Sequence, residues 1–147
     1  MIVLDTNVLS ELMRSKPERS VVAWLDQQPP ESVWTTAISV FEVRFGLQIL
    51  PHGARRRRLN EAFERAIADT LGARVLPFDD EAATAAAKHA AERRTAGKPL
   101  DFRDLEIAGI ASSRHAAIVT RTVDHFLGLG IGVVNPWERD APVRGIP

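Results

Sequence analysis

The chain has no cysteine among its 147 residues, which excludes disulfide bonds, thiolate nucleophiles and cysteine-ligated zinc. It also lacks any apolar run near the roughly 20 residues that a membrane-spanning helix requires. Asp5 interrupts the apolar start and no cationic segment precedes it, so no signal peptide is indicated. We therefore expect a cytosolic protein with no membrane association.

Net charge is absent as well, because nineteen basic side chains balance nineteen acidic ones. Overall charge consequently provides no steering toward nucleic acid or membrane. The sequence contains neither a glycine-rich phosphate loop nor a convincing Ser-His-Asp arrangement. The histidines lack the relative spacing of metal ligands, and we interpret all four as surface or boundary residues: His52, His89, His115 and His125.

Strand-length apolar runs alternate with segments of helical period along the chain. The runs occupy residues 1–4, 33–35, 74–76, 117–120 and 132–134. This alternation predicts an α/β fold in which helices cover both faces of a parallel sheet. The length suits one domain, which we place at residues 1–137. Residues 138–147 are polar and contain proline, and we interpret them as a C-terminal surface tail.

Asp5 directly follows the first strand-length run. Ligands of open parallel sheets bind just beyond the carboxyl ends of the strands, so Asp5 is a candidate site residue. It is equally suited to be the N-cap of the following helix. Thr6 or Asn7 can provide that cap instead, which leaves Asp5 free to point into the crevice.

Glu42 lies within a predicted helix that begins at Thr36 and ends near Leu50. The apolar positions at spacings of three and four predict its buried stripe: Ile38, Phe41, Phe45 and Ile49. Glu42 belongs on or beside that stripe. A carboxylate facing a core costs several kcal/mol unless it is paired or binds a metal. Arg44 and Arg14 are the alternative pairing partners.

Asp104 lies in the first turn of another predicted helix. The alanine-rich helix 82–96 ends at Gly97-Lys98-Pro99, and Asp101 is the expected N-cap of the next helix, which runs to about Arg114. Asp101 and Asp104 also approximate a capping box, which is the structural alternative for Asp104. Ile107 and Ala108 continue the face of Asp104, so we expect it to lean toward the sheet.

Together, three carboxylates at one crevice repel each other unless a cation joins them. Carboxylates with few nitrogen ligands suit Mg²⁺ or Mn²⁺ rather than zinc. We therefore predict a metal site in which Asp5 and Asp104 are the ligands and Glu42 completes the acidic pocket. Such a site hydrolyses phosphodiesters by activating water and neutralising charge in the transition state.

The acidic motifs resemble those of a known family. Asp5-Thr6-Asn7-Val8-Leu9-Ser10-Glu11 is similar to the opening of PIN-domain ribonucleases, specifically VapC-type toxins of bacterial toxin–antitoxin pairs. Phe41-Glu42-Val43-Arg44-Phe45-Gly46-Leu47 and Asp104-Leu105-Glu106-Ile107-Ala108 resemble the second and third motifs of these proteins. Asn135-Pro136-Trp137 resembles the FitB-like subgroup.

The resemblance implies a three-layer α/β/α sandwich with a central parallel sheet. It also implies Mg²⁺- or Mn²⁺-dependent cleavage of single-stranded RNA by Asp5, Glu42 and Asp104, a small antitoxin as partner, and a homodimer. One position departs from the family pattern, because Thr122 stands where Asp or Asn is common. Asp124 is the alternative occupant of this fourth position. The number of metal ions, one or two, is therefore left open.

Basic side chains near the predicted crevice are candidates to contact RNA phosphates. Arg121 follows the fourth strand and Arg14 follows the first helix. The four consecutive arginines at 55–58 point all around a helix, so they cannot form one binding stripe.

Two other functions fit parts of the pattern. A haloacid-dehalogenase-type phosphatase also begins with a strand and an aspartate, but it needs a second acid where this chain has Asn7. A non-catalytic PIN-like binding module would use the same acids only as helix caps or as acceptors for a partner's arginine.

Overall fold

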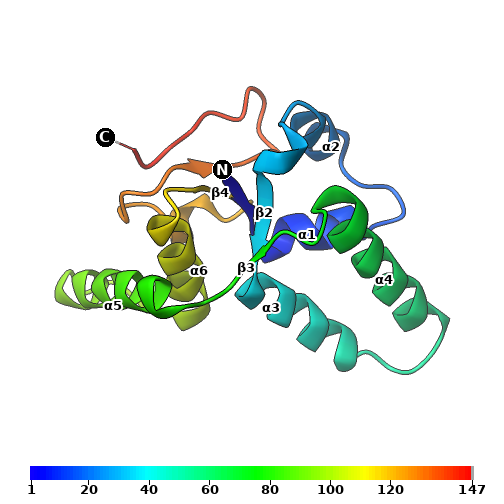
Figure 1. Cartoon of the computed structure of the whole chain (residues 1–147), viewed down its shortest axis with the longest axis horizontal. Helices are drawn as coiled ribbons and strands as arrows, with labels where there is room; N and C mark the ends of the chain where they lie inside the picture. Colours follow the sequence, from blue (N-terminus) through cyan, green and yellow to red (C-terminus); the bar gives the residue numbers. More distant parts are fainter. Residues whose placement is uncertain (147) are drawn as a thin grey trace.

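A computed structural model describes residues 1–146 of the chain (Figure 1). Its sheet contains five short strands: β1 (Ile2–Leu4), β2 (Val33–Thr36), β3 (Val75–Leu76), β4 (Ala117–Val119) and β5 (Val133–Val134). All neighbouring strands are parallel, in the order β3-β2-β1-β4-β5. The strand order reverses direction at β1, so the carboxyl ends of β1 and β4 form a topological switch point, where ligands bind in open α/β sheets.

Helices cover both faces of this sheet. They are α1 (Thr6–Leu12), α2 (Arg19–Asp26), α3 (Ala37–Gln48), α4 (Ala54–Arg65), α5 (Asp80–Thr95) and α6 (Phe102–Ser113). Shorter helical turns occur at Pro30–Ser32 (η1), Ala66–Thr70 (η2) and Val123–His125 (η3). Figure 1 places α5 and α6 on one side of the strands and α1 and α4 on the other.

Alternate residues of the central strands supply two separate cores. Val3 and Ile118 pack with residues of α5 and α6, whereas Leu4 and Val119 pack with residues of α1 to α4. Successive side chains of a strand point to opposite faces, which explains why neighbours in sequence enter different cores. The predicted three-layer α/β/α sandwich with a central parallel sheet is confirmed.

The first turn of α6 begins as the sequence predicts. The Asp101 side chain accepts hydrogen bonds from the backbone N–H groups of Arg103 (3.0 Å) and Asp104 (3.3 Å), so Asp101 is the N-cap. Later in α6, Gly109 lies against α5 so closely that an added Cβ would be 2.4 Å from the carbonyl oxygen of Ala82. This contact fixes α6, and with it Asp104, against the rest of the sandwich.

The predicted buried stripe of α3 is wrong at three of its four positions, and only Ile38 packs, partly buried, against the core. Phe41, Phe45 and Ile49 are 56%, 52% and 68% exposed. The residues that α3 buries are Ser39, Val43 and Leu47. Both sets recur every four residues, so helical period alone could not select between them; the packing of α3 against α1 and α4 does.

The chain around Arg144 folds back onto the sheet edge. Arg144 and Val133 exchange two backbone hydrogen bonds of 2.8 Å, and the Arg144 guanidinium pairs with Glu138. The division between a domain at 1–137 and a tail at 138–147 stays a prediction. Within residues 1–146 no helix is both long and apolar enough to cross a membrane.

Candidate active site

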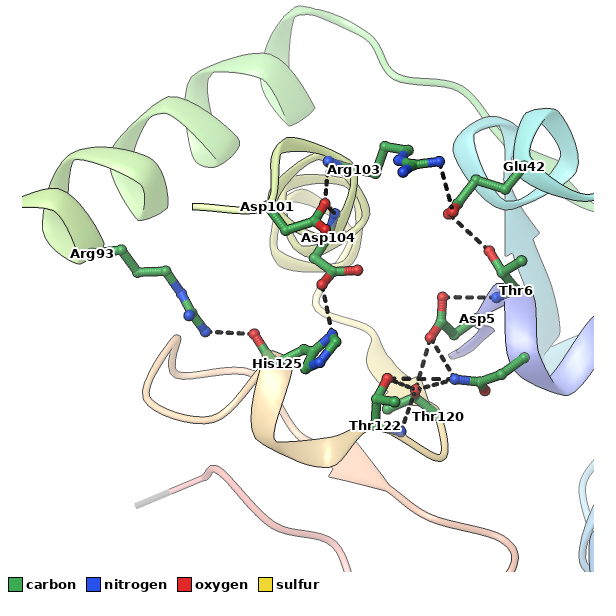
Figure 2. Close-up of polar contacts among 11 residues, drawn as sticks. Asp5, Thr6, Glu42, Arg93, Asp101, Arg103, Asp104, Thr120, Thr122 and His125 are labelled. Carbon is green, nitrogen blue, oxygen red and sulfur yellow. Dashed lines mark hydrogen bonds and ion pairs between the residues drawn. The ribbon is translucent and has the colours of Figure 1, made fainter. Parts of the chain in front are cut away.

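One pocket of about 510 Å³ collects all three predicted site residues. Asp5 follows β1, Glu42 lies on α3, and Asp104 lies in the first turn of α6. Figure 2 shows the three carboxylates directed toward a common space between these elements. The tertiary fold therefore brings together acids that are far apart in sequence, at the switch point of the sheet.

Asp5 is both the cap of α1 and a wall of this pocket. Its Oδ1 accepts the backbone N–H of Thr6 at 2.7 Å, so of the three candidate caps Asp5 itself is the N-cap of α1, and it lines the pocket as well. The other oxygen, Oδ2, accepts the hydroxyl of Thr120 (2.7 Å) and the amide of Asn7 (3.1 Å). Burial raises the pKa of the Asp5 carboxyl above its ordinary value, and the negative charge of Asp104 adds to this effect. The hydrogen bonds from Thr120 and Thr6 oppose the rise.

A threonine network stands behind Asp5. The buried Thr120 hydroxyl accepts hydrogen bonds from the Asn7 amide (3.0 Å) and from the backbone N–H of Thr122 (3.1 Å) while it donates to Asp5. Thr122 lines the pocket, whereas Asp124 lines a neighbouring hollow beside Asp104. Thr122 thus gives the pocket a neutral hydroxyl, and its role as the fourth residue of the site stays a prediction.

Side chains of α1 and α6 hold Glu42 in place, and the sequence alone predicted neither contact. Its Oε1 accepts the Thr6 hydroxyl at 2.9 Å, and its Oε2 lies 3.4 Å from the guanidinium of Arg103. Neither of the two arginines named as alternative partners pairs with Glu42, because Arg44 pairs with Glu64 and Arg14 pairs with Glu11. No pattern in the sequence connects Arg103 with Glu42, since the pair spans α6 and α3.

Asp104 is paired with a histidine. Its Oδ2 lies 2.8 Å from Nδ1 of His125, which follows β4 in η3 (Figure 2). Burial raises the pKa of the Asp104 carboxyl; the charges of Asp101 and Glu42 add to the rise and His125 opposes it. The sequence indicated His125 only as a surface or boundary residue, and its contact with Asp104 was missed. Its position near the end of β4 was the available signal.

Two of the three acids have the donor chemistry for a hard divalent cation. Within residues 1–146 no group of three or more acidic or histidine side chains is arranged to hold a metal ion. Asp5 and Asp104, however, are half-buried or buried carboxylates close enough for one charge to raise the pKa of the other. Mg²⁺ is commonly bound by one or two carboxylates together with water, so this pair has the donor chemistry that the ion requires.

Basic and aromatic side chains complete the pocket lining. Arg121 and Arg14 both line it, as their positions after β4 and α1 predicted. The Arg121 guanidinium lies 5.5 Å from the ring centre of Trp137, which also lines the pocket. The pocket therefore combines carboxylates at its base with cations and an aromatic ring at its sides.

Comparison with known proteins shows the family to which the chain belongs. Residues 2–125 match the PIN domain family. The VapC ribonuclease Y4jK of Sinorhizobium fredii is 41% identical over 138 residues, which cover 94% of this chain and 99% of that protein. Toxin FitB of Neisseria gonorrhoeae is 38% identical with the same coverage.

Solved structures agree. The crystal structure of FitAcB from Neisseria gonorrhoeae has a TM-score of 0.85 and 37% identity, covering 95% of this chain and all of that chain. The structure of FitAB bound to an IR36 DNA fragment has the same TM-score and identity, with 95% and 97% coverage. The chain therefore belongs to the PIN-domain family. The predicted resemblance to VapC-type toxins and their FitB-like subgroup is confirmed.

Proposed function

We propose that the chain is the toxin of a toxin–antitoxin pair, an endoribonuclease that hydrolyses single-stranded RNA with the help of Mg²⁺ or Mn²⁺. The observation that carries this proposal is the convergence of Asp5, Glu42 and Asp104 on one pocket at the switch point of the sheet. The names of the VapC and FitB relatives support the toxin and ribonuclease parts. We place the protein in the cytosol, where its RNA substrate would be found.

Asp5 and Asp104 would hold the divalent ion, which supplies charge neutralisation at the phosphate and an activated water. The hydrogen bonds from Thr120, Asn7 and the Thr6 backbone keep the Asp5 carboxylate in one orientation. Glu42 completes the acidic pocket, and it would orient the attacking water through lone pairs of its oxygens that the Thr6 hydroxyl and Arg103 do not use.

The basic and aromatic side chains that line the pocket would bind the substrate. Arg121 and Arg14 are the cations that line it, and guanidinium groups bind phosphate oxygens through paired donors. The Trp137 ring offers a surface on which an unpaired base can stack. A single strand supplies such exposed bases, whereas a duplex does not.

Cleavage of single-stranded RNA by the purified chain, free of antitoxin, tests the activity. We expect cutting that requires Mg²⁺ or Mn²⁺ and that falls by about a hundredfold or more in Asp5→Asn and Asp104→Asn, since each loses a proposed metal ligand. Asp26→Asn is the matched control, because Asp26 is exposed at the end of α2 and does not line the pocket. Unchanged cutting by the two pocket variants would end this assignment.

We also propose two protein partners. The solved relatives named FitAB and VapBC support an antitoxin. A hollow of about 440 Å³ beside α1 and α4 suits such a partner, because Leu12, Met13 and Ala62 line it together with Arg58 and Arg65. An antitoxin segment with apolar and acidic side chains would complement this lining.

The second partner is another copy of the chain. Phe41 and Phe45 are stacked, with ring centres 6.1 Å apart, and form an exposed apolar surface on α3 together with Ile49. Exposed apolar surfaces of this kind support a protein interface. Sedimentation should show a dimer that Phe45→Glu weakens by at least tenfold. Phe102→Glu changes a still more exposed phenylalanine on α6, outside this surface, and should leave the dimer unchanged. Equal self-association of Phe45→Glu and the parent would exclude this surface.

The phosphatase alternative has lost its support. The chain belongs to the PIN-domain family. At the position where a phosphatase needs its second acid, the Asn7 amide donates hydrogen bonds to Asp5 and Thr120. The binding-module alternative predicts neither metal binding nor RNA cleavage, so the cleavage assay distinguishes it.

A further inference from the structure

Arg103 reaches from α6 to Glu42 on α3 (Figure 2). One Nη1–Oε2 distance of 3.4 Å joins them, and the other oxygen of Glu42 accepts the Thr6 hydroxyl. Both oxygens of Glu42 are thus already engaged by groups of the chain. The Glu42 side chain is 21% exposed and the Arg103 side chain is 53% exposed, so the contact lies at the edge of the pocket, where solvent reaches the guanidinium.

Asp104, the next residue, is engaged differently. His125 contacts one of its oxygens, and within residues 1–146 the other oxygen has no hydrogen-bond donor. The first turn of α6 therefore presents a guanidinium to Glu42 and a free carboxylate oxygen to the pocket. Thr122, which also lines the pocket, contributes a hydroxyl and no charge.

These contacts separate the three acids of the pocket into two sets. Glu42 lies beside the Arg103 guanidinium, whereas within residues 1–146 neither Asp5 nor Asp104 is paired with an arginine or a lysine, and their two formal charges match the charge of one divalent ion. We propose that the pocket binds a single divalent cation on Asp5 and Asp104, and that Arg103 supplies the positive charge at Glu42 where a second cation would otherwise bind. This inference rests on the proposed function, because it concerns the metal content of the same site.

Arg103 is then a positioning residue that acts through Glu42. Removing its charge leaves the Glu42 carboxylate unpaired beside the proposed metal ligands, so the pocket becomes more negative by one charge. A second cation then gains a ligand in Glu42, and the first binds more tightly. Arg103→Lys retains the positive charge and should retain the single site, although an ammonium lacks the planar donor array of a guanidinium.

Calorimetry and electron paramagnetic resonance with Mn²⁺ can count the ions bound to the metal-free full chain. We expect one ion per chain in the parent protein and in Arg103→Lys. Arg103→Gln should bind two ions, with the first held roughly three- to tenfold more tightly because one nearby positive charge is gone. Arg57→Gln is the matched control, since Arg57 is exposed on α4 and outside the pocket.

A double variant shows whether the effect passes through Glu42. Glu42→Gln combined with Arg103→Gln should return to one ion, because the ligand that Arg103 covers is then neutral. Two ions in the parent protein, or one ion with unchanged affinity in Arg103→Gln, would overturn the inference while RNA cleavage left the proposed function intact. A parent chain that neither binds Mn²⁺ nor cuts RNA would overturn both.

Discussion

Substitution of Thr120 by valine removes one hydroxyl that donates to Asp5 while it accepts from Asn7 and Thr122. Valine has nearly the same shape, so the fully buried site stays filled. A hydrogen bond to a charged group contributes about 1.5–3 kcal/mol. We therefore expect Thr120→Val to lower the free energy of unfolding by about 2–3 kcal/mol at neutral pH, since the carboxylate of Asp5 loses a donor in a buried position.

Thr35→Val is the matched control on the neighbouring strand. Thr35 is also fully buried, but its hydroxyl donates to the neutral backbone carbonyl of Leu4 at 2.8 Å. Loss of a neutral hydrogen bond should cost about 1 kcal/mol. Urea denaturation of both variants and the parent, followed from pH 4 to pH 8, measures the difference.

The dependence on pH identifies the charged acceptor. The Thr120 hydrogen bond lowers the pKa of Asp5 in the folded state, so its removal raises that pKa further while the unfolded value stays unchanged. The variant then binds more protons when folded, and its deficit relative to the parent grows as pH rises through the Asp5 pKa of the two proteins. Each unit of difference in pKa corresponds to about 1.4 kcal/mol. A Thr120→Val deficit that does not change with pH, or that equals the Thr35→Val deficit, would refute this reasoning.

Two further predictions concern packing and metal binding. Gly109→Ala should destabilise the fold by about 1–3 kcal/mol in urea denaturation, because the added Cβ would lie 2.4 Å from the Ala82 carbonyl oxygen. Gly46→Ala is the control: an added Cβ meets nothing within 4 Å there, so this variant should gain up to about 1 kcal/mol of stability. A Gly109→Ala variant more stable than Gly46→Ala would contradict the packing of α5 on α6. Mn²⁺ should raise the melting temperature more at pH 7.5 than at pH 5, because burial raises the pKa of Asp5 and Asp104 and protons then compete with the ion. Asp5→Asn should abolish that stabilisation, and an increase of equal size at both pH values would argue against these two ligands.

Much of the fold follows from local patterns. Apolar runs separated by helical segments predicted the parallel sheet, and the caps at Asp101 and Thr36 start α6 and α3 as expected. These features are readable because a cap or a strand is decided by residues close together in the chain. The buried face of α3 was not readable, since Phe41 and Phe45 are as apolar as the residues that α3 does bury.

The candidate site divides in the same way. The acidic motifs at Asp5, Glu42 and Asp104 were evident in the sequence, as was the neutral Thr122. Their catalytic role stays a proposal. The basic side chains that contact them, Arg103 at Glu42 and His125 at Asp104, were found only in the folded chain.

By itself the sequence determined which elements form, in what order, and which of them carry a carboxylate. Only the tertiary structure decided which carboxylates keep free oxygens and which basic side chains they contact, because those pairings join α6 to α3 and to η3 across the switch point of the sheet. Electrostatic balance depends on distance in space, and local sequence patterns do not encode the distance between elements that meet only after folding.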